Sequence, residues 1–295
     1  MNKRILVTGA DGQLGRAFRL ILGENEQILY TNRSNLDITN ADAVAETVAR
    51  FAPEVMLNCA AYTDVERAEE ERDAAFCVNS DAVSYLAEAA KQTDALLVHI
   101  STDYLFDGSQ SAPIPESASP HPLNVYGESK LAGEQALIAS GCRYLIFRTS
   151  WLYSPWGDNF VRNMLRLAAE RDTLYVVDDQ TGTPTYAPLL ADAILRIIER
   201  GAPLERQIFN YSSEGQCTRY QMIASAVRAL QYADCRVLPC PSSLFPTKAV
   251  RPAYSVLDKG KIRRALHHYI DDWEDTLYEF VQNDFSLWHS INISS

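Results

Sequence analysis

The chain has 295 residues, of which 47% are apolar and 22% charged, a composition typical of a globular protein that dissolves in water. Its formal net charge of -11 argues against nucleic acid or an anionic membrane as a bulk partner, although backbone amides can still bind a phosphate-bearing small molecule. No segment reaches the ~18 apolar residues of a membrane span and the N-terminus lacks the features of a signal peptide, so we expect a cytoplasmic protein.

The cysteines show no pattern that indicates a metal site or a disulfide framework. They form no Cys-x-x-Cys pair, and no histidine lies at ligand spacing from them. We therefore predict free thiols and no bound metal.

The first element is a short apolar strand, residues 4–8, that runs directly into a glycine-rich turn. Gly9, Gly12 and Gly15 have the spacing G-x-x-G-x-x-G, and an amphipathic helical pattern begins at Leu14. A strand, a glycine turn and a helix in this order aim the first helix amides at a pyrophosphate. We predict a dinucleotide site here; a tight turn that binds no ligand is the alternative.

A second strand is expected at residues 27–30, and no acidic residue follows it directly to hold the ribose hydroxyls of NAD. Arg33 follows instead, and a guanidinium suits the 2′-phosphate of NADPH. We therefore predict NADPH as the cofactor, with NADH possible. An exposed arginine in a loop is the alternative interpretation. A helix capped by Thr39 or Asn40 comes next.

Two further buried strands are expected at residues 54–59 and 95–101. Small residues follow the third strand at 60–61, so a flat ligand can lie against the backbone. The fourth strand delivers Thr102-Asp103-Tyr104 to its carboxyl end. Open parallel sheets bind their ligands at that edge.

Tyr126 and Lys130 lie near the start of a helix that is expected to end at about Ser140. Residues four apart share one helix face. A lysine ammonium about 4 Å away would favour the phenolate by ~4 kcal/mol at an intermediate dielectric. That would bring the tyrosine pKa near ~7, where a general acid works best. A packed tyrosine beside a solvated lysine is the alternative.

A fifth strand at residues 144–149 completes the alternation of strands and helices. The pattern predicts an α/β fold, a Rossmann-type doubly wound parallel sheet with a smaller C-terminal substrate-binding lobe. We predict an NAD(P)-binding Rossmann domain at 1–150 and a mainly substrate-binding lobe at 151–295, from which some segments return to the first domain. The expected later elements are helices at 159–171, 189–200, 219–230 and 272–285, strands at 174–177 and 207–210, a loop at 179–185 and an irregular segment at 239–246.

Four motifs occur in a specific order along the chain: Gly9-x-x-Gly12-x-x-Gly15, Asn58-Cys59-Ala60-Ala61, Ser101-Thr102 and Tyr126-x-x-x-Lys130. Together they resemble the extended short-chain dehydrogenase/reductase superfamily. Within it the chain looks most like the dTDP-4-dehydrorhamnose reductase family, and the similarity extends to Gln180-Thr181-Gly182-Thr183-Pro184-Thr185.

The resemblance implies NADPH-dependent reduction of the C4 keto group of dTDP-4-dehydro-L-rhamnose, a small-molecule nucleotide sugar. In the implied triad, Tyr126 protonates the carbonyl oxygen, Thr102 hydrogen-bonds it, and Lys130 tunes Tyr126 and holds the nicotinamide ribose. The implied substrate contacts are Thr63, Val65, Thr102, Asp103, Tyr104, Tyr126 and Trp151. The cofactor contacts, from the resemblance and the motifs together, are Gly9, Gly12, Gln13, Leu14, Gly15, Arg33, Asp37, Ile38, Ala60, Ala61, Tyr62, Asn79, Ser101, Tyr126 and Lys130.

Two departures from related enzymes are informative. Nucleotide-sugar 4,6-dehydratases carry Asp-Glu directly after the threonine, whereas this chain has Asp103-Tyr104. Because a phenol cannot replace the carboxylate base, simple reduction is favoured over dehydration. Some reductases of the family dimerise through Mg²⁺ held by a glutamate after the glycine loop. Arg16-Ala17-Phe18 has no carboxylate, which argues against a Mg²⁺-bridged dimer.

Other functions stay open. One is a reductase or epimerase of another nucleotide-linked 4-keto sugar. A second is a non-catalytic regulatory protein like the β subunit of methionine adenosyltransferase, which resembles the same reductases. Arg251 is a candidate for the sugar diphosphate, or else a partner in an exposed ion pair.

Overall fold

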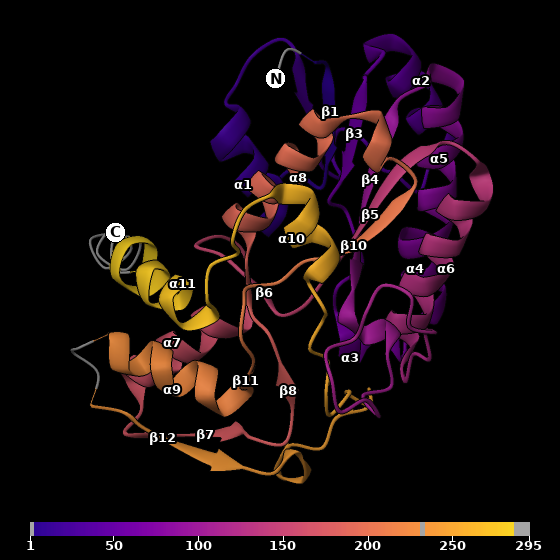
Figure 1. The fold of residues 1–295 in the computed structure, drawn as a ribbon. Coiled ribbons are helices and arrows are strands. Elements are labelled where there is room, and N and C mark those ends of the chain that lie inside the picture. Colours follow the sequence, from indigo (N-terminus) through magenta and orange to yellow (C-terminus); the bar gives the residue numbers. More distant parts are fainter. Residues whose placement is uncertain (1–2, 231–233, 286–295) are drawn as a thin grey trace.

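A six-stranded parallel sheet lies at the centre of the computed structural model, which describes residues 3–230 and 234–285 (Figure 1). The strands, in sheet order, are β10 (Gln207–Asn210), β5 (Arg143–Thr149), β4 (Leu96–Thr102), β3 (Val55–Asn58), β1 (Ile5–Thr8) and β2 (Ile28–Tyr30). The order reverses between β1 and β3, and sheets of this kind bind dinucleotides at that switch point.

Helices cover both faces of the sheet (Figure 1). One layer consists of α1 (Gln13–Leu22), α8 (Ala187–Arg200) and α10 (Gly260–Leu266), and the other of α2 (Ala41–Phe51), α5 (Ala82–Thr93) and α6 (Val125–Ser140). Phe18, Ile194 and Ile262 are buried in the first layer. Val44 and Leu137 are buried in the second. Since both faces are covered, the strands are apolar almost throughout, and the predicted doubly wound sheet is confirmed.

The C-terminal lobe has a core of its own, shown in the lower part of Figure 1. Its elements are α7 (Phe160–Glu170), α9 (Arg219–Ala229), α11 (Trp273–Glu279), a parallel pair of β7 (Thr173–Val177) with β12 (Arg236–Cys240), and the short strands β6 (Leu152–Tyr153), β8 (Thr181–Gly182), β9 (Thr185–Tyr186) and β11 (Cys217–Thr218). Met222 and Leu277 are buried between its helices. Both α8 and β10 belong to the sheet layers although they follow residue 150 in the chain. The predicted boundary at that residue stays a prediction.

Most expected elements lie where the sequence places them, and four differ. The predicted long helix at about 74–91 is interrupted by a π-helical turn, Cys77–Asp81, between α4 (Arg72–Phe76) and α5. The expected loop at 179–185 contains β8 and part of β9, and the segment expected to be irregular begins inside β12. The final helix continues from α11 as a π-helical segment, Phe280–Phe285. The short α10 was not predicted.

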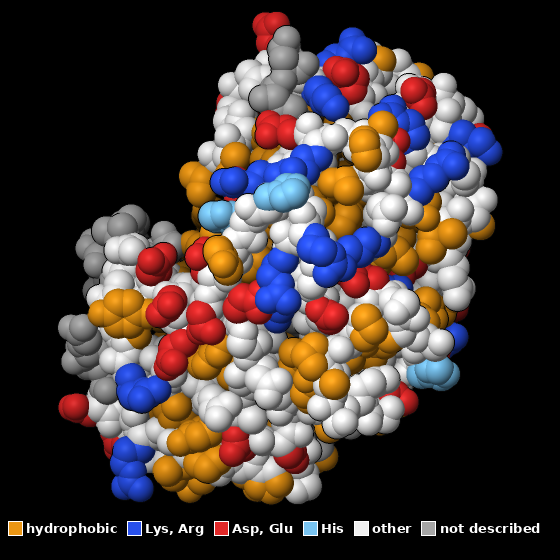
Figure 2. Space-filling model, viewed as in Figure 1, with side chains coloured by type: hydrophobic (Ala, Val, Ile, Leu, Met, Phe, Trp, Pro, Cys, Tyr) orange, Lys and Arg blue, Asp and Glu red, His pale blue; other side chains and the backbone are white. Residues whose placement is uncertain are grey.

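Ion pairs around α10 connect the lobe to the sheet. The carboxylate of Glu214 lies 3.1 Å from the Arg263 guanidinium and 3.9 Å from the Lys259 ammonium. Figure 2 shows basic and acidic side chains close together over this part of the visible face. Segments after residue 210 therefore contact both parts of the molecule.

Candidate active site

The glycine turn after β1 is shaped for a ligand at the switch point. Gly9 has a left-handed backbone with φ +61°, and a Cβ there would lie 2.6 Å from the amide nitrogen of Ala60. A Cβ at Gly15 would lie 2.4 Å from the carbonyl oxygen of Gly9. Side chains at these positions would separate β1, β3 and α1. The turn therefore requires the two glycines that the motif supplies.

Two observations show that a dinucleotide fits this crevice. Helix α1 has Gly12 as its N-cap residue and no side-chain cap, so its first amides stay available to a pyrophosphate. The Ser101 hydroxyl, near the end of β4 on the other side of β3, is buried and has no hydrogen-bond partner in the described residues. Ordinarily such a group is satisfied, and a bound polar ligand would satisfy it.

Asn79 braces the loop after β3. Its amide oxygen accepts from the Tyr62 backbone N–H at 2.9 Å, and its nitrogen donates to the Tyr62 carbonyl and the Ser129 hydroxyl, both at 3.0 Å. The π-helical turn brings Asn79 to this position, and a Cβ at Gly133 of α6 would lie 2.0 Å from the Asn79 carbonyl oxygen. Asn79 is buried, and its hydrogen bonds hold the backbone of Tyr62 in place. Its own contact with the cofactor stays a prediction.

Tyr126 and Thr102 meet at the carboxyl edge. Tyr126 is the second residue of α6, whose first turn is capped by the Asn124 side chain, and part of its surface stays exposed. Its ring packs edge-to-face on Tyr104 with centroids 5.5 Å apart. Burial raises the pKa of Tyr126 above its usual value of 10.0, and the nearby Thr102 hydroxyl acts in the opposite direction. The site therefore holds a protonated phenol within reach of a second hydroxyl.

Lys130 does not lower the pKa of Tyr126 as the sequence led us to expect. Its Nζ donates to the Ile100 carbonyl oxygen at 2.7 Å and lies 3.4 Å from Nε2 of His99. Burial lowers the pKa of Lys130 from 10.5 to about 8, against the opposing effect of Glu134. The prediction considered only Tyr126 and Lys130. It did not include the Ile100 carbonyl of β4, which accepts a hydrogen bond from the Lys130 ammonium. His99 was not predicted, because nothing in the sequence shows that it faces α6.

Asp103 is deeply buried beside Thr102. The residue is 2% exposed, and its Oδ1 accepts from the Thr102 hydroxyl at 3.2 Å. Oδ2 has no hydrogen-bond partner of normal geometry in the described residues. Burial raises the pKa of Asp103 from 3.8 to about 6, although Ser255 and the charge of Arg219 lower it.

Trp151 is held by the Gln180–Thr185 motif. It has a left-handed backbone with φ +48°, which is uncommon for a residue other than glycine. The Thr185 amide donates to its carbonyl oxygen at 3.3 Å, and a Cβ at Gly182 would lie 2.6 Å from its ring. Backbone strain of this kind persists where the surrounding structure enforces it, often at a binding site.

Arg219, which was not among the predicted site residues, lies on the Trp151 ring. Its guanidinium carbon is 3.7 Å from the ring centroid, within the range of a cation–π contact. It is absent from the ion pairs and hydrogen bonds found in the described chain, although its charge acts on Asp103. Only its place at the start of α9, after the Thr218 cap, was visible in the sequence.

Arg251 is the other arginine on this side. Its guanidinium donates to the Tyr104 hydroxyl at 2.8 Å and to a Glu66 oxygen at 2.6 Å. Both members of the ion pair are partly exposed. Arg251 therefore forms the ion pair that the sequence analysis gave as the alternative to a diphosphate contact. Its guanidinium also lies next to Tyr104.

The remaining predicted contacts lie around the crevice. Arg33 is exposed after β2, whereas the Asp37 carboxylate accepts from the amide and hydroxyl of Thr39 at 3.0 and 2.7 Å. Ile38, Ala60 and Ala61 are buried or partly buried. Thr63 and Val65 flank the Asp64 cap of α3 (Val65–Ala68). The Gln13 side chain accepts from the Ser154 hydroxyl at 3.0 Å, and Leu14 is buried behind the turn.

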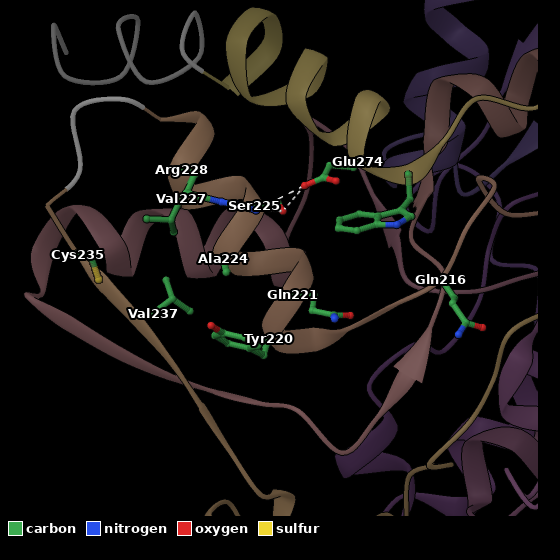
Figure 3. Close-up of a pocket in the computed structure, with 11 residues that line it drawn as sticks. Gln216, Tyr220, Gln221, Ala224, Ser225, Val227, Arg228, Cys235, Val237 and Glu274 are labelled. Atoms are coloured by element: carbon green, nitrogen blue, oxygen red, sulfur yellow. Dashed lines mark hydrogen bonds and ion pairs between the residues drawn. The ribbon is translucent and has the colours of Figure 1, made fainter.

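A cavity of about 540 Å³ lies away from these residues, in the C-terminal lobe (Figure 3). It is lined by side chains of α9 and its neighbours, and Ser225, Arg228 and Glu274 interact at its rim. A second cavity of about 430 Å³ lies by the glycine turn and includes Asp11 and Trp156. The predicted site residues do not line the first cavity.

Within residues 3–230 and 234–285 there is no group of three or more His, Cys, Asp or Glu side chains that could hold a metal ion. In the same part of the chain, the helices are too short or too polar to cross a membrane.

Comparison with known proteins identifies relatives that are named as reductases of dTDP-linked ketosugars. The model of the RmlD substrate binding domain family matches residues 3–285. A dTDP-4-dehydrorhamnose reductase of Aggregatibacter actinomycetemcomitans is 40% identical over 285 residues, which cover 93% of this chain and 97% of that protein. A dTDP-4-keto-6-deoxy-D-glucose reductase of Streptomyces niveus is also 40% identical, over 282 residues that cover 94% of this chain and 96% of the relative.

Solved structures agree with these relatives. A dTDP-4-dehydrorhamnose reductase of Bacillus anthracis in complex with NADP is 36% identical, with a TM-score of 0.89 over 95% of this chain and 99% of that one. A UDP-glucose 4-epimerase of Thermotoga maritima has a TM-score of 0.79 at 20% identity, which shows a shared fold.

The strand order, the glycine turn and the Tyr126–Lys130 helix at the same edge define a Rossmann-type oxidoreductase. Relatives that span nearly the whole chain then fix its place within that class. The chain belongs to the dTDP-4-dehydrorhamnose reductase family, the family of the RmlD substrate binding domain, and the resemblance seen in the sequence is confirmed.

Proposed function

We propose that this protein reduces the C4 keto group of dTDP-4-dehydro-L-rhamnose to the alcohol, with NADPH as the reductant. The observation that carries the proposal is the proximity of the Tyr126 phenol and the Thr102 hydroxyl, which lowers the pKa of that phenol, at the sheet edge that also carries the glycine turn. The names of the relatives support the same substrate. NADP in the Bacillus anthracis structure supports the cofactor.

The dinucleotide supplies a hydride to the C4 carbon when bound. Tyr126 gives its proton to the carbonyl oxygen, and Thr102 donates a hydrogen bond to the same oxygen. Positioned acids of this kind contribute about 10²–10⁴-fold to a rate. Lys130 holds the ribose hydroxyls with its ammonium, and its hydrogen bond to the Ile100 carbonyl oxygen keeps α6 and Tyr126 in place against β4.

The cofactor lies along the crevice in this proposal. Free amides of α1 hold the pyrophosphate, with Gly9, Gly12, Gln13, Leu14 and Gly15 around it. Arg33 binds the 2′-phosphate from its exposed position after β2. The contacts nearer the nicotinamide and adenosine are Asp37, Ile38, Ala60, Ala61, Tyr62, Asn79 and Ser101.

The sugar lies on the lobe side. Trp151, Tyr104 and Asp103 surround the ring, together with Thr63 and Val65. Arg219 presents a guanidinium with no ion-pair partner in the described residues, so an anionic ligand group would compensate its charge. We assign the substrate diphosphate to Arg219, with Arg251 beside it.

We also propose that the protein works in the cytoplasm, where reduced dinucleotides and nucleotide sugars are at hand. A Mg²⁺-bridged dimer is not part of the proposal, because Arg16–Phe18 offers no carboxylate.

A second candidate substrate is dTDP-4-keto-6-deoxy-D-glucose. The Streptomyces niveus relative named for that sugar is as similar to this chain, at 40% identity, as the Aggregatibacter reductase. Both reactions reduce a C4 ketone, and the substrates differ in ring configuration. Tyr126, Thr102 and Lys130 would act in the same way on either.

A substrate panel tests the proposal. Purified protein with NADPH is given the two dTDP-linked ketosugars and their UDP- and GDP-linked counterparts, and absorbance at the NADPH band is followed. We expect the highest kcat/KM with dTDP-4-dehydro-L-rhamnose. Preference for the glucose-derived ketone would select the second candidate. NADPH binding without turnover of any ketosugar would favour the regulatory alternative.

A further inference from the structure

A row of buried polar side chains crosses three neighbouring strands of the sheet and ends at Lys130. This polar row consists of Thr8 of β1, Asn58 of β3, His99 of β4 and Lys130 of α6, each at most 2% exposed. The Thr8 hydroxyl donates to Oδ1 of Asn58 at 2.7 Å, and the Asn58 amide nitrogen lies 3.2 Å from Nδ1 of His99. Nε2 of His99 lies 3.4 Å from Nζ of Lys130, which donates to the Ile100 carbonyl oxygen at 2.7 Å. Each member of the row is thus connected to the next by a hydrogen-bond contact.

The sequence of donors and acceptors along the polar row depends on the charge of Lys130. An amide nitrogen can only donate, so Nδ1 of His99 accepts from Asn58, and in a neutral imidazole Nε2 then carries the hydrogen. An Nε2–H group that faces an ammonium would place two donors against each other. A free amine, in contrast, accepts from Nε2–H with its lone pair and still donates to the Ile100 carbonyl oxygen. The arrangement in the structure therefore fits Lys130 as the amine.

The same four side chains can also pair with an ammonium. When the Asn58 amide is reversed, its nitrogen donates to the Thr8 hydroxyl oxygen, which accepts as readily as it donates, and its oxygen accepts from Nδ1–H of His99. Nε2 of His99 is then without a hydrogen and accepts from the Lys130 ammonium. The reversal exchanges an oxygen and an NH₂ group of nearly the same size, so it needs no movement of the backbone. In both arrangements the buried groups of the polar row are paired with one another, as buried polar groups generally are.

Lys130 is the member of the polar row that gains and loses a proton. Burial lowers the pKa of His99 well below its usual value of 6.5, and the charge of Lys130 acts in the same direction, so His99 stays neutral. Burial also lowers the pKa of Lys130 to about 8, whereas Glu134, one turn further along α6 and paired with Arg148 of β5, raises it. A buried amine that titrates there needs a neighbour that can both accept and donate, and neutral imidazole is such a group.

We propose that His99 is a positioning residue for Lys130, which changes its tautomer together with a reversal of the Asn58 amide and so pairs with Lys130 both as the ammonium and as the amine. From the ammonium state to the amine state the polar row loses one proton to water and with it the positive charge, while His99 carries one N–H group throughout. In each state Lys130 keeps its hydrogen bond to the Ile100 carbonyl oxygen and has one further N–H for a ligand. The inference rests on the proposed role of Lys130 in cofactor binding, but the change of tautomer requires neither cofactor nor ketosugar.

Nitrogen NMR of the cofactor-free protein tests the change of tautomer directly, because the two neutral tautomers of imidazole and its charged form have different ¹⁵N shifts. The protein is labelled with ¹⁵N-histidine, and the His99 signals are those that disappear in His99→Gln. We expect the Nδ1–H tautomer below a midpoint of about pH 8, where Lys130 titrates, and the Nε2–H tautomer above it. Exposed His121, which lies outside the polar row, should show no step at that pH. One unchanged His99 tautomer from about pH 6 to about pH 10, or a step that persists in Lys130→Met, would overturn the proposal.

Two substitutions separate pairing from packing. His99→Leu fills the space without a donor or an acceptor, whereas His99→Gln offers both ends of an amide to Lys130. An ammonium loses more than an amine when its partner is removed, because hydrogen bonds to charged groups are the stronger ones.

The pH at which the Kd for NADPH rises, about 8 in the wild type, should therefore fall by about one unit in His99→Leu and stay near the wild-type value in His99→Gln. A wild-type pH profile in His99→Leu would overturn the proposal. Equal shifts in both variants would also overturn it, since they would show that the ring only fills space. If NADPH does not bind at all, the proposed function fails, and the tautomer measurement still decides the inference.

Discussion

The Lys130 ammonium donates a hydrogen bond to the carbonyl oxygen of Ile100 at 2.7 Å. Ile100 lies in β4, the strand that ends with Thr102. The contact therefore ties α6, and with it Tyr126, to the strand that carries the second hydroxyl of the site. Lys130 fixes the relative position of the two catalytic elements before it acts on any ligand.

Cofactor binding should weaken as pH rises through about 8. Burial lowers the pKa of Lys130 from 10.5 to about 8, so the ammonium is present below that pH and is lost above it. A charged amine is a stronger donor to ribose hydroxyls than a neutral one. The Kd for NADPH, followed by its fluorescence, should rise about tenfold between pH 7 and 9.5, an effect of ~1.4 kcal/mol. In Lys130→Met the Kd should be high at every pH; a wild-type Kd that stays constant would contradict the role.

Arg219→Met should weaken dTDP binding by about 10- to 100-fold, as expected for the loss of ~1.4–2.8 kcal/mol from a charge-assisted contact. Methionine keeps the packing on Trp151 and removes the charge. Calorimetric titration with dTDP and with thymidine measures the effect. Thymidine binding should not change, because it has no diphosphate.

Arg228→Met is the matched control, since Arg228 lies on the same helix and its side chain is 75% exposed. It should bind dTDP as the wild type does. Equal losses of dTDP and thymidine binding in Arg219→Met would show that the arginine shapes the pocket and does not bind the diphosphate.

Arg33→Ala should raise the KM for NADPH more than the KM for NADH. The exposed guanidinium can pair with the 2′-phosphate, which NADH lacks. Steady-state kinetics with each cofactor at a saturating ketosugar concentration give the two ratios. If both KM values change by the same factor, Arg33 has no role in cofactor choice.

Glu134→Ala should lower the free energy of unfolding by about 3–5 kcal/mol, because it leaves the buried Arg148 without its partner. The two side chains lie 2.7 Å apart and are 2% and 4% exposed. Chemical denaturation measures the change. Asp192→Ala breaks the exposed pair with Arg196 and should cost less than about 1 kcal/mol. Similar losses in both variants would refute the distinction.

Local patterns were enough to predict the scaffold. A glycine turn follows the first strand, and small residues follow some of the other apolar strands. These patterns predict a parallel sheet covered by helices on both faces, with the ligand site at the carboxyl ends of its strands. The Tyr126–Lys130 helix and Thr102 were placed at that edge for the same reason. The short α10 was missed because Gly260–Leu266 is too brief for a clear helical period.

Local sequence patterns could not predict the contacts between segments that lie far apart in the chain. The direction of Lys130 depends on the Ile100 carbonyl, and the position of Arg219 depends on the strained backbone of Trp151. Asn79, which accepts a hydrogen bond from the Tyr62 backbone, lies in a π-helical turn that interrupts the expected helix. Each of these is a tertiary effect that a single sequence does not display.

Tyr126→Phe tests the central claim most directly, because it removes one hydroxyl and preserves the ring that packs on Tyr104. Single-turnover reduction of dTDP-4-dehydro-L-rhamnose is followed with NADPH bound to both forms. We predict a rate at least about 10²-fold lower in the variant with an unchanged Kd for NADPH. A variant that reduces the ketosugar at the wild-type rate would contradict the account.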